Sequence, residues 1–307
     1  MIQIHNTSAR DLKSLVEHHF NKLSPVVENA IDRHAPNKQR LYLKKNLRKI
    51  ITGVPAELIR VHGNYKRFCA VHNTTANSGI KKAFSYDNFL KRKSYDIYDL
   101  AAGLKVNVCP YCNRQYTFTI ISKSKKITRP EFDHFFSQEN YPLLSLSFYN
   151  LIPSCVICNS RLKGRSRFSL RRNIHPYLYG FKDDLKFNYH PININGACGL
   201  TDEITIKLEI RNNALRKKLI QNNCRIFHLN DIYKEHKDIV REIIRKHYIS
   251  GGEYLKTLAK SFPKIFTSAE ELYQMAFGNY YAEIDFHKRP LGKITRDIFE
   301  QLKFDAI

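Results

Sequence analysis

The sequence predicts an α+β protein in which a central region of short strands and clustered cysteines is flanked by mainly helical N- and C-terminal regions. Two observations predict this class. Apolar residues recur at helical spacing near both ends of the chain, and the middle combines paired cysteines with alternating apolar and polar residues. We expect a helical, basic region over 1–105, a core over 106–178, and a small β-rich segment followed by helices over 179–307.

The clearest N-terminal helix is predicted from Leu43 to Val54. Its apolar residues fall on one face, and basic residues fall largely on the other. Two interpretations of the basic face stay open, an ordinary solvated face and a contact with phosphates. The polar stretch from His72 to Gly79 predicts a loop.

Strands are predicted in the middle of the chain. The stretch from Gln115 to Ile120 alternates as a half-buried strand does, and the basic run 122–129 predicts a turn that leads to a second strand around Phe132. Residues 181–212 also look β-rich. After Ala214 the pattern returns to helix, with one apolar face made by Ile232, His236, Ile239, Val240, Ile243 and His247.

The charge balance favours a polyanionic partner. The 307 residues include 51 Lys and Arg against 28 Asp and Glu, a formal net charge of +23. Such an excess attracts nucleic acid, although a high net charge can also serve only to keep a protein soluble.

The apolar content of the sequence makes a fully disordered chain unexpected. No export signal or membrane-spanning run is visible, so we expect a cytoplasmic protein without a membrane partner.

Two cysteine pairs carry the strongest signal in the sequence. Cys109 and Cys112 are separated by two residues, and Cys155 and Cys158 repeat this spacing further along the chain. Two such knuckles complete a closed, tetrahedral four-thiolate site, which predicts a structural Zn²⁺ ion. The other three cysteines, Cys69, Cys198 and Cys224, show no such pairing and are expected to be buried thiols.

A second group of residues lies between and after the knuckles. Asp133 and His134 end an apolar strand pattern, Asn150 follows 16 residues later, and Asn159 comes directly after the last cysteine of the pairs. In this order the motifs resemble the HNH, or ββα-metal, nuclease family over about 55 to 65 residues. The resemblance implies a core of two antiparallel strands and a helix around one divalent ion, braced here by zinc knuckles.

The resemblance also implies a role for each residue. His134 matches the general base that takes a proton from water, and Asp133 and Asn159 match the ligands of a catalytic Mg²⁺ or Mn²⁺ ion. Asn150 matches a supporting residue that bonds the backbone around the base. Simpler interpretations stay open: a strand histidine, an Asp133 paired with Arg129, a helix-capping Asn159 and a turn-capping Asn150.

Cations follow Asn159 without an intervening acid up to residue 172. Arg161, Lys163, Arg165 and Arg167 are predicted to bind the phosphates of nucleic acid, and a solvated charge run is the alternative. His175 is compatible with a metal ligand or phosphate contact and equally with a buried turn histidine.

The segment 139–147 departs from the usual HNH pattern. With its Tyr-Pro-Leu run it more loosely resembles the HNH subunits of anti-phage systems of the Septu type, in which the nuclease works beside an ABC-type ATPase. We therefore expect an HNH endonuclease that hydrolyses phosphodiester bonds in bacterial defence or restriction, with DNA favoured over RNA. The alternatives are a non-catalytic zinc-dependent nucleic-acid-binding module and a partner-regulated subunit of an ATPase complex.

Overall fold

The computed structural model describes the chain except for residues 6, 8–10, 75–77, 124, 263–264 and 305–307. Its contacts group into two compact units. Unit 1 comprises Met1–Ile4, Asn107–Tyr116 and Leu178–Ile307, and unit 2 comprises His5–Val106 and Thr117–Tyr177. The α+β class is confirmed, since helices predominate and the strands form small two-stranded sheets.

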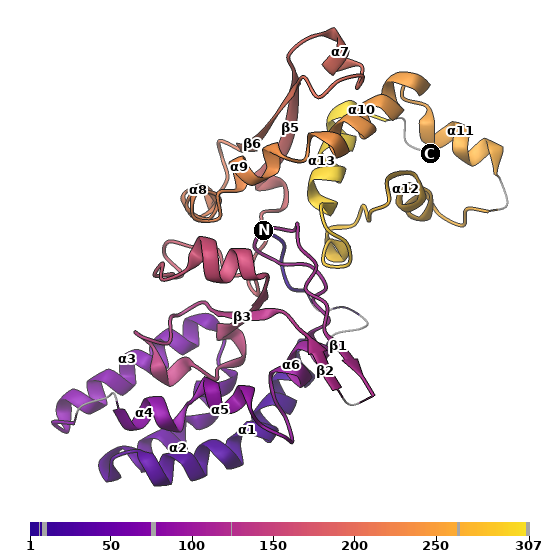
Figure 1. Cartoon of the computed structure of the whole chain (residues 1–307). Helices are drawn as coiled ribbons and strands as arrows, with labels where there is room; N and C mark the ends of the chain where they lie inside the picture. The colour runs from indigo at the N-terminus through magenta and orange to yellow at the C-terminus, as the bar shows by residue number, and fades with distance from the viewer. Residues whose placement is uncertain (6, 8–10, 75–77, 124, 263–264, 305–307) are drawn as a thin grey trace. The chain divides into compact units, whose positions relative to one another are not determined.

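The N-terminal part of unit 2 is helical, as predicted (Figure 1). The helices are α1 (Leu12–His34), α2 (Asn37–Thr52), α3 (Pro55–Val71), α4 (Ser78–Ala83), α5 (Tyr86–Leu90) and α6 (Ile97–Leu104). Local chemistry sets several of their ends. The Asp11 carboxylate accepts a hydrogen bond from the Lys13 backbone at the start of α1, and Asp96 and Asp99 form a reciprocal capping box at α6.

The helix predicted over Leu43–Val54 corresponds to the C-terminal part of α2, which begins earlier than predicted, at Asn37, and ends two residues earlier, at Thr52. It ends there because Pro55 disfavours helical geometry at Val54, the residue before it. Val54 instead precedes the first residue of α3. The predicted loop likewise ends early, since α4 begins at Ser78; residues 75–77 of that loop lie outside the described residues.

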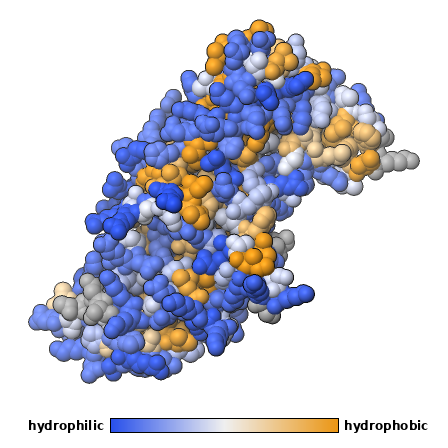
Figure 2. Space-filling model, in the orientation of Figure 1, coloured by the Kyte–Doolittle hydropathy of each residue, from blue (hydrophilic) through white to orange (hydrophobic). Residues whose placement is uncertain are grey.

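The basic face of α2 contacts acids of α1. Lys44 Nζ lies 2.7 Å from Asp32, and Arg48 Nη2 lies 2.6 Å from Glu17. All four side chains are exposed, so each pair contributes at most about 1 kcal/mol to stability. Hydrophilic residues cover most of the visible surface of the unit 2 helices in Figure 2. The apolar face of α2 is buried at Leu43, Leu47, Ile50 and Ile51.

The strand predicted over Gln115–Ile120 is wrong for most of its length. Tyr116 makes a single isolated bridge to Val108, and β1 covers only Ile120–Ser122. Its partner β2, Lys125–Thr128, occupies the stretch predicted as a basic turn. Every residue of both strands is exposed, so backbone pairing rather than a buried face defines this hairpin.

The second strand and the helix that follows are placed as expected of a strand–strand–helix core. Strand β3, Glu131–His134, pairs antiparallel with β4, Leu151–Ser154. The segment between them holds two short 3-10 turns, η1 (Pro142–Leu144) and η2 (Phe148–Asn150). After β4 the chain enters η3, a π-helix over Ile157–Lys163.

Unit 1 contains the predicted β-rich segment and C-terminal helices. Strand β5 (Leu185–Pro191) pairs antiparallel with β6 (Ile204–Ile210), which confirms the strands predicted within 181–212. The predicted helical face over 232–247 is divided between two helices, with His236 at the start of the second. The remaining elements are η4 (Lys182–Asp184), α7 (Ile194–Ala197), α8 (Lys217–Ile226), α9 (Leu229–Lys234), α10 (Lys237–Ser250), α11 (Tyr254–Ser261), α12 (Ala269–Phe277), η5 (Glu283–Asp285) and α13 (Gly292–Leu302).

A membrane-spanning helix is absent from the part of the chain that the structure describes, because none of its helices combines the necessary length with sufficient apolar character.

Candidate functional site

The four paired cysteines form one buried cluster. The Sγ atoms of Cys109, Cys112, Cys155 and Cys158 all lie within 4.8 Å of one another. The first knuckle is a tight turn, in which the Asn113 backbone N–H donates to the Cys109 carbonyl at 2.8 Å. In the second, the Cys158 backbone N–H donates to Cys155 Sγ at 3.4 Å. The paired spacing therefore brings four soft ligands together.

This cluster fits Zn²⁺ in both chemistry and size. Thiolates are the ligands of structural zinc, and sulfurs about 3.8 Å apart follow from a tetrahedron with Zn–S bonds of about 2.3 Å. The observed separations allow that geometry. All four thiols are buried, as a site without an open coordination position requires. The cysteines outside the cluster, Cys69, Cys198 and Cys224, are buried as expected, and burial raises the pKa of the Cys224 thiol to about 11.

His134 lies at the end of β3 with both ring nitrogens engaged. Nε2 is 2.9 Å from the Ser145 carbonyl, and Nδ1 is 3.0 Å from the side-chain amide nitrogen of Gln138. Because a carbonyl only accepts, Nε2 carries the proton and Nδ1 keeps its lone pair toward Gln138. Burial lowers the pKa of His134 to about 4, so the imidazole is neutral at pH 7. Gln138 itself is exposed.

Asp133 precedes His134 on β3 and pairs with a lysine of the following helix. Lys163 Nζ lies 2.5 Å from Asp133 Oδ1 and donates a second hydrogen bond to the His134 carbonyl at 2.9 Å. Both partners are buried, with Asp133 3% and Lys163 4% exposed. The simpler interpretation, a pair between Asp133 and Arg129, is replaced by this ion pair between β3 and η3.

Asn159 lies within η3, and its side chain does not cap the helix. Its Nδ2 donates to Glu131 Oε2 at 2.9 Å, and the neighbouring Ser160 hydroxyl donates to the same oxygen at 2.8 Å. Glu131 and Asp133 alternate along β3 and so share one face of the strand. Within the described residues no group donates to the amide oxygen of Asn159, which leaves a hard oxygen ligand of the kind that Mg²⁺ prefers.

Asn150 is fully buried and bonds only to backbone. Its Oδ1 accepts from the Phe136 N–H at 2.7 Å, and its Nδ2 donates to the carbonyls of Phe136 at 3.1 Å and Leu144 at 2.9 Å. The asparagine thereby fixes the segment that directly follows His134. These are the contacts expected of a supporting residue, while its part in catalysis stays a prediction.

The basic residues after Asn159 separate into two kinds. Arg161, Arg165 and Arg167 are exposed, as a contact with nucleic acid requires. Lys163 is buried against Asp133, so the prediction of an exposed phosphate contact is corrected for this residue. A charge run in a sequence does not reveal which cation is buried.

His175 is buried, with its ring 4.3 Å from that of Phe135.

Several contributors to the site were not predicted. Glu131 was not predicted as a site residue, although strand alternation places it on the same face of β3 as Asp133. The four-residue spacing from Asn159 to Lys163 similarly places two side chains on nearby positions of a helix. No sequence signal identifies the Ser145 carbonyl or Gln138 as partners of His134.

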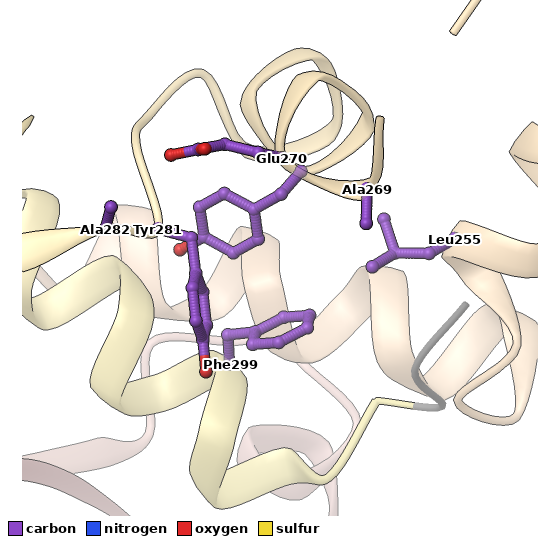
Figure 3. Close-up of a pocket in the computed structure, with 7 residues that line it drawn as sticks. Leu255, Ala269, Glu270, Tyr281, Ala282 and Phe299 are labelled. Carbon is purple, nitrogen blue, oxygen red and sulfur yellow. The ribbon is translucent and has the colours of Figure 1, made fainter. Parts of the chain in front are cut away.

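A separate cavity of about 420 Å³ lies in unit 1, in the region of α11–α13. Figure 3 shows the rings of Tyr281 and Phe299 beside it. The buried hydroxyl of Tyr273, which also lines this cavity, has no hydrogen-bond partner among the described residues. The lining is largely apolar and includes none of the predicted site residues.

Comparisons with known proteins give a relative that matches part of the chain. Over 138 residues the chain is 29% identical to Protein ea31 of Escherichia phage lambda, a match that covers 42% of this chain and 41% of the phage protein. The chain thus matches about two fifths of the length of this curated relative. No protein family and no solved structure matches.

Proposed function

We propose that the protein is an HNH-type endonuclease that hydrolyses phosphodiester bonds with the help of a divalent metal ion. The observation that supports this most directly is the state of His134. The Ser145 carbonyl holds the tautomer whose lone pair is on Nδ1, and the ring is fixed on the strand directly beside Asp133. A buried and oriented imidazole with a lone pair on Nδ1 is suited to the role of a general base.

In the proposed reaction His134 Nδ1 accepts a proton from the attacking water. Gln138 now bonds this nitrogen from an exposed position, so displacement of its side chain opens the lone pair to water. The Nε2 bond to Ser145 keeps the ring oriented while the proton moves. Asn150 holds the segment after His134 through its three bonds to backbone. The contribution of the chain is then orientation and proton transfer.

Asp133 and Asn159 would hold the divalent ion, Mg²⁺ or Mn²⁺, with Glu131 beside them. Carboxylate and amide oxygens fit such an ion, although the Lys163 ammonium now contacts Asp133 Oδ1. When bound, the ion supplies positive charge to the phosphate oxygens and the leaving oxygen. The buried four-cysteine cluster holds the structural zinc ion in this proposal.

Nucleic acid is the proposed substrate, with DNA favoured over RNA. The net charge of +23 and the exposed Arg161, Arg165 and Arg167 support binding of a polyanion. The motif resemblance further suggests work in bacterial anti-phage defence or restriction, beside a partner ATPase of the ABC type. Co-purification with the product of a neighbouring gene tests that partner.

Incubation of supercoiled plasmid with the protein and Mg²⁺ or Mn²⁺ tests the proposed activity. We expect the plasmid to be nicked or linearised, and His134→Ala to slow cutting by about 10²- to 10⁴-fold because the general base is lost. The variant His72→Ala, which changes an exposed histidine at the end of α3, is the control and should cut normally.

Zinc content and retention on DNA should be nearly unchanged in His134→Ala. A folded variant that still cuts at the normal rate would remove His134 from the mechanism. If the intact protein binds DNA and never cuts it with either ion, the alternative of a non-catalytic zinc-dependent binding module takes precedence. If cutting appears only with a partner, the protein is a regulated subunit.

A further inference from the structure

A second cavity, of about 300 Å³, lies within unit 2. Three cations line it. Lys66 comes from α3, whereas Arg167 and Arg172 come from the segment that follows η3. No carboxylate belongs to its lining. Three positive charges gathered around one cavity repel one another, and an anion inside it would relieve that repulsion.

Neutral hydrogen-bond donors line the same cavity. The Asn140 side chain donates to Ser137 Oγ at 2.8 Å, which leaves the Ser137 hydroxyl proton to be donated to another group. Lys66 and Arg167 are exposed, and neither forms an ion pair with any residue that the structure describes. The lining thus combines a lysine ammonium group, arginine guanidinium groups and a serine hydroxyl. Together such groups recognise phosphate oxygens.

One wall of the cavity also belongs to the candidate nuclease site. The Phe168 ring lines the cavity and lies 4.8 Å from Lys163 Nζ, the cation paired with Asp133. The same ring packs against Phe135, which follows His134, at a centroid distance of 5.4 Å. The Phe168 side chain therefore both lines the cavity and contacts Lys163 of the Asp133–Lys163 pair.

We propose that this cavity, named here the Lys66–Arg172 pocket, binds a phosphate group of the nucleic-acid strand next to the bond that is cut. The proposal rests on the proposed nuclease function and deepens it, since it names a positioning site for the substrate. Tyr141, a second ring in the lining, offers an aromatic surface for a neighbouring sugar or base. Phosphate held in the pocket fixes the register of the strand relative to His134 and Asp133.

Two double variants with the same loss of charge test the pocket. Lys66→Gln with Arg172→Gln removes two lining cations, while Arg67→Gln with Arg171→Gln removes the cations next to them in the chain, which are exposed and do not line the pocket. Both variants lower the net charge equally. Binding of fluorescent single-stranded oligonucleotides, with and without a 5′-phosphate, is measured by anisotropy without added Mg²⁺ or Mn²⁺, so that no cutting intervenes and the structural zinc ion is retained.

We expect the pocket variant to bind at least about tenfold more weakly and the control variant to lose less than about threefold. Thermal unfolding of both variants checks that each is folded. Weakening of both oligonucleotides alike indicates an internal phosphodiester, whereas weakening of the 5′-phosphorylated one alone indicates a strand end. Inorganic phosphate should compete with binding to the intact protein and not to the pocket variant.

Equal loss of affinity in the two double variants would overturn the proposal, because only general charge would then matter. The plasmid assay distinguishes failure of the nuclease proposal from failure of the pocket proposal. If only the nuclease proposal fails, the plasmid stays uncut, but the pocket and control variants still differ in oligonucleotide affinity measured by anisotropy.

Discussion

At the scale of single residues, Asn150 shows how one buried side chain fixes a segment beside His134. It bonds two carbonyls and one N–H of the backbone, and the Leu144 carbonyl also accepts from the Ser147 N–H at 3.2 Å. Asn150→Ala should lower the free energy of unfolding by on the order of 3 kcal/mol, because buried groups left unpaired keep their desolvation cost. Urea unfolding measures this change.

The matched control for that substitution is Asn46→Ala. Asn46 is half-buried on α2 and makes a single side-chain bond to the Tyr42 carbonyl at 2.8 Å, so its loss should cost much less. Equal destabilisation by the two variants would show that the three bonds of Asn150 are energetically unimportant.

Residue types were predicted more successfully than residue partners. The paired spacing correctly predicted the four cysteines that cluster, while the roles assigned to Asp133, His134, Asn150 and Asn159 from the order of motifs stay predictions. The burial of Lys163 could not be predicted in the same way, because a run of cations looks alike whether its members face solvent or a buried carboxylate. Hydrogen bonds to backbone, such as that of His134, depend on a fold that sequence periodicity does not specify.

At the scale of elements, the Asp133–Lys163 ion pair connects β3 to η3. Lys163→Met leaves a buried carboxylate without its cation and should destabilise the protein by roughly 3–5 kcal/mol. Combining it with Asp133→Asn should cost less than the sum of the two single changes, because neither charge then remains. Chemical unfolding of the four proteins of this cycle gives the coupling energy.

The same variant tests the divalent-ion site without relying on activity. If Asp133 and Asn159 hold the ion, Mn²⁺ should raise the unfolding temperature of Lys163→Met by binding the freed carboxylate, and should leave the double variant unchanged. Stabilisation of both variants to the same extent would place the ion elsewhere.

The cysteine knuckles provide a second element-scale prediction. Cys155→Ser should abolish zinc binding, which is expected at about one ion per chain, and should unfold the surrounding region. Cys224→Ser is a closely matched control, since Cys155 and Cys224 are each 8% exposed and Cys224 lies outside the cluster. Elemental analysis and circular dichroism measure the two effects. A soluble, active and zinc-free Cys155→Ser protein would refute the four-thiolate site.

Element prediction succeeded where a pattern coincided with burial. Helix α2 was recognised because Leu43, Leu47, Ile50 and Ile51 are all buried on one face. The alternation over Gln115–Ile120 led to a wrong prediction because Phe118 and Ile120 are both exposed, so the apolar positions of the pattern do not form a buried face. Strand β2 was missed for the related reason that its lysines carry no apolar alternation.

At the scale of the whole molecule, stability should fall in acid because several histidines are buried and neutral. His19 is one of them: Nε2 donates to the Leu146 carbonyl, and Nδ1 accepts from the Tyr95 hydroxyl. Burial lowers the pKa of His19 to about 4, below its ordinary value of 6.5. The unfolded chain therefore binds the proton first, and stability present above pH 6.5 is lost as the pH falls toward 4.

His19 alone should account for a loss on the order of 3 kcal/mol between those pH values. In His19→Gln the unfolding free energy should be lower at pH 7 and should depend less on pH in this window. The neighbouring exposed residue supplies the control, since His18→Gln should keep most of the acid sensitivity, because burial is the main cause of the lowered His19 pKa. Urea unfolding at a series of pH values measures the slopes, and identical slopes in both variants would contradict the assignment.

The bond from the Phe136 amide to Asn150 Oδ1 has a consequence for solvent exchange. Its acceptor is a side chain, and the residue lies beyond the end of β3, so this proton is not protected by the strand ladder. Deuterium can replace it only when the segment between β3 and β4 opens, an event that need not separate the two strands. The Phe136 amide is thus a spectroscopic reporter of how often the surroundings of His134 loosen while the rest of the unit stays intact.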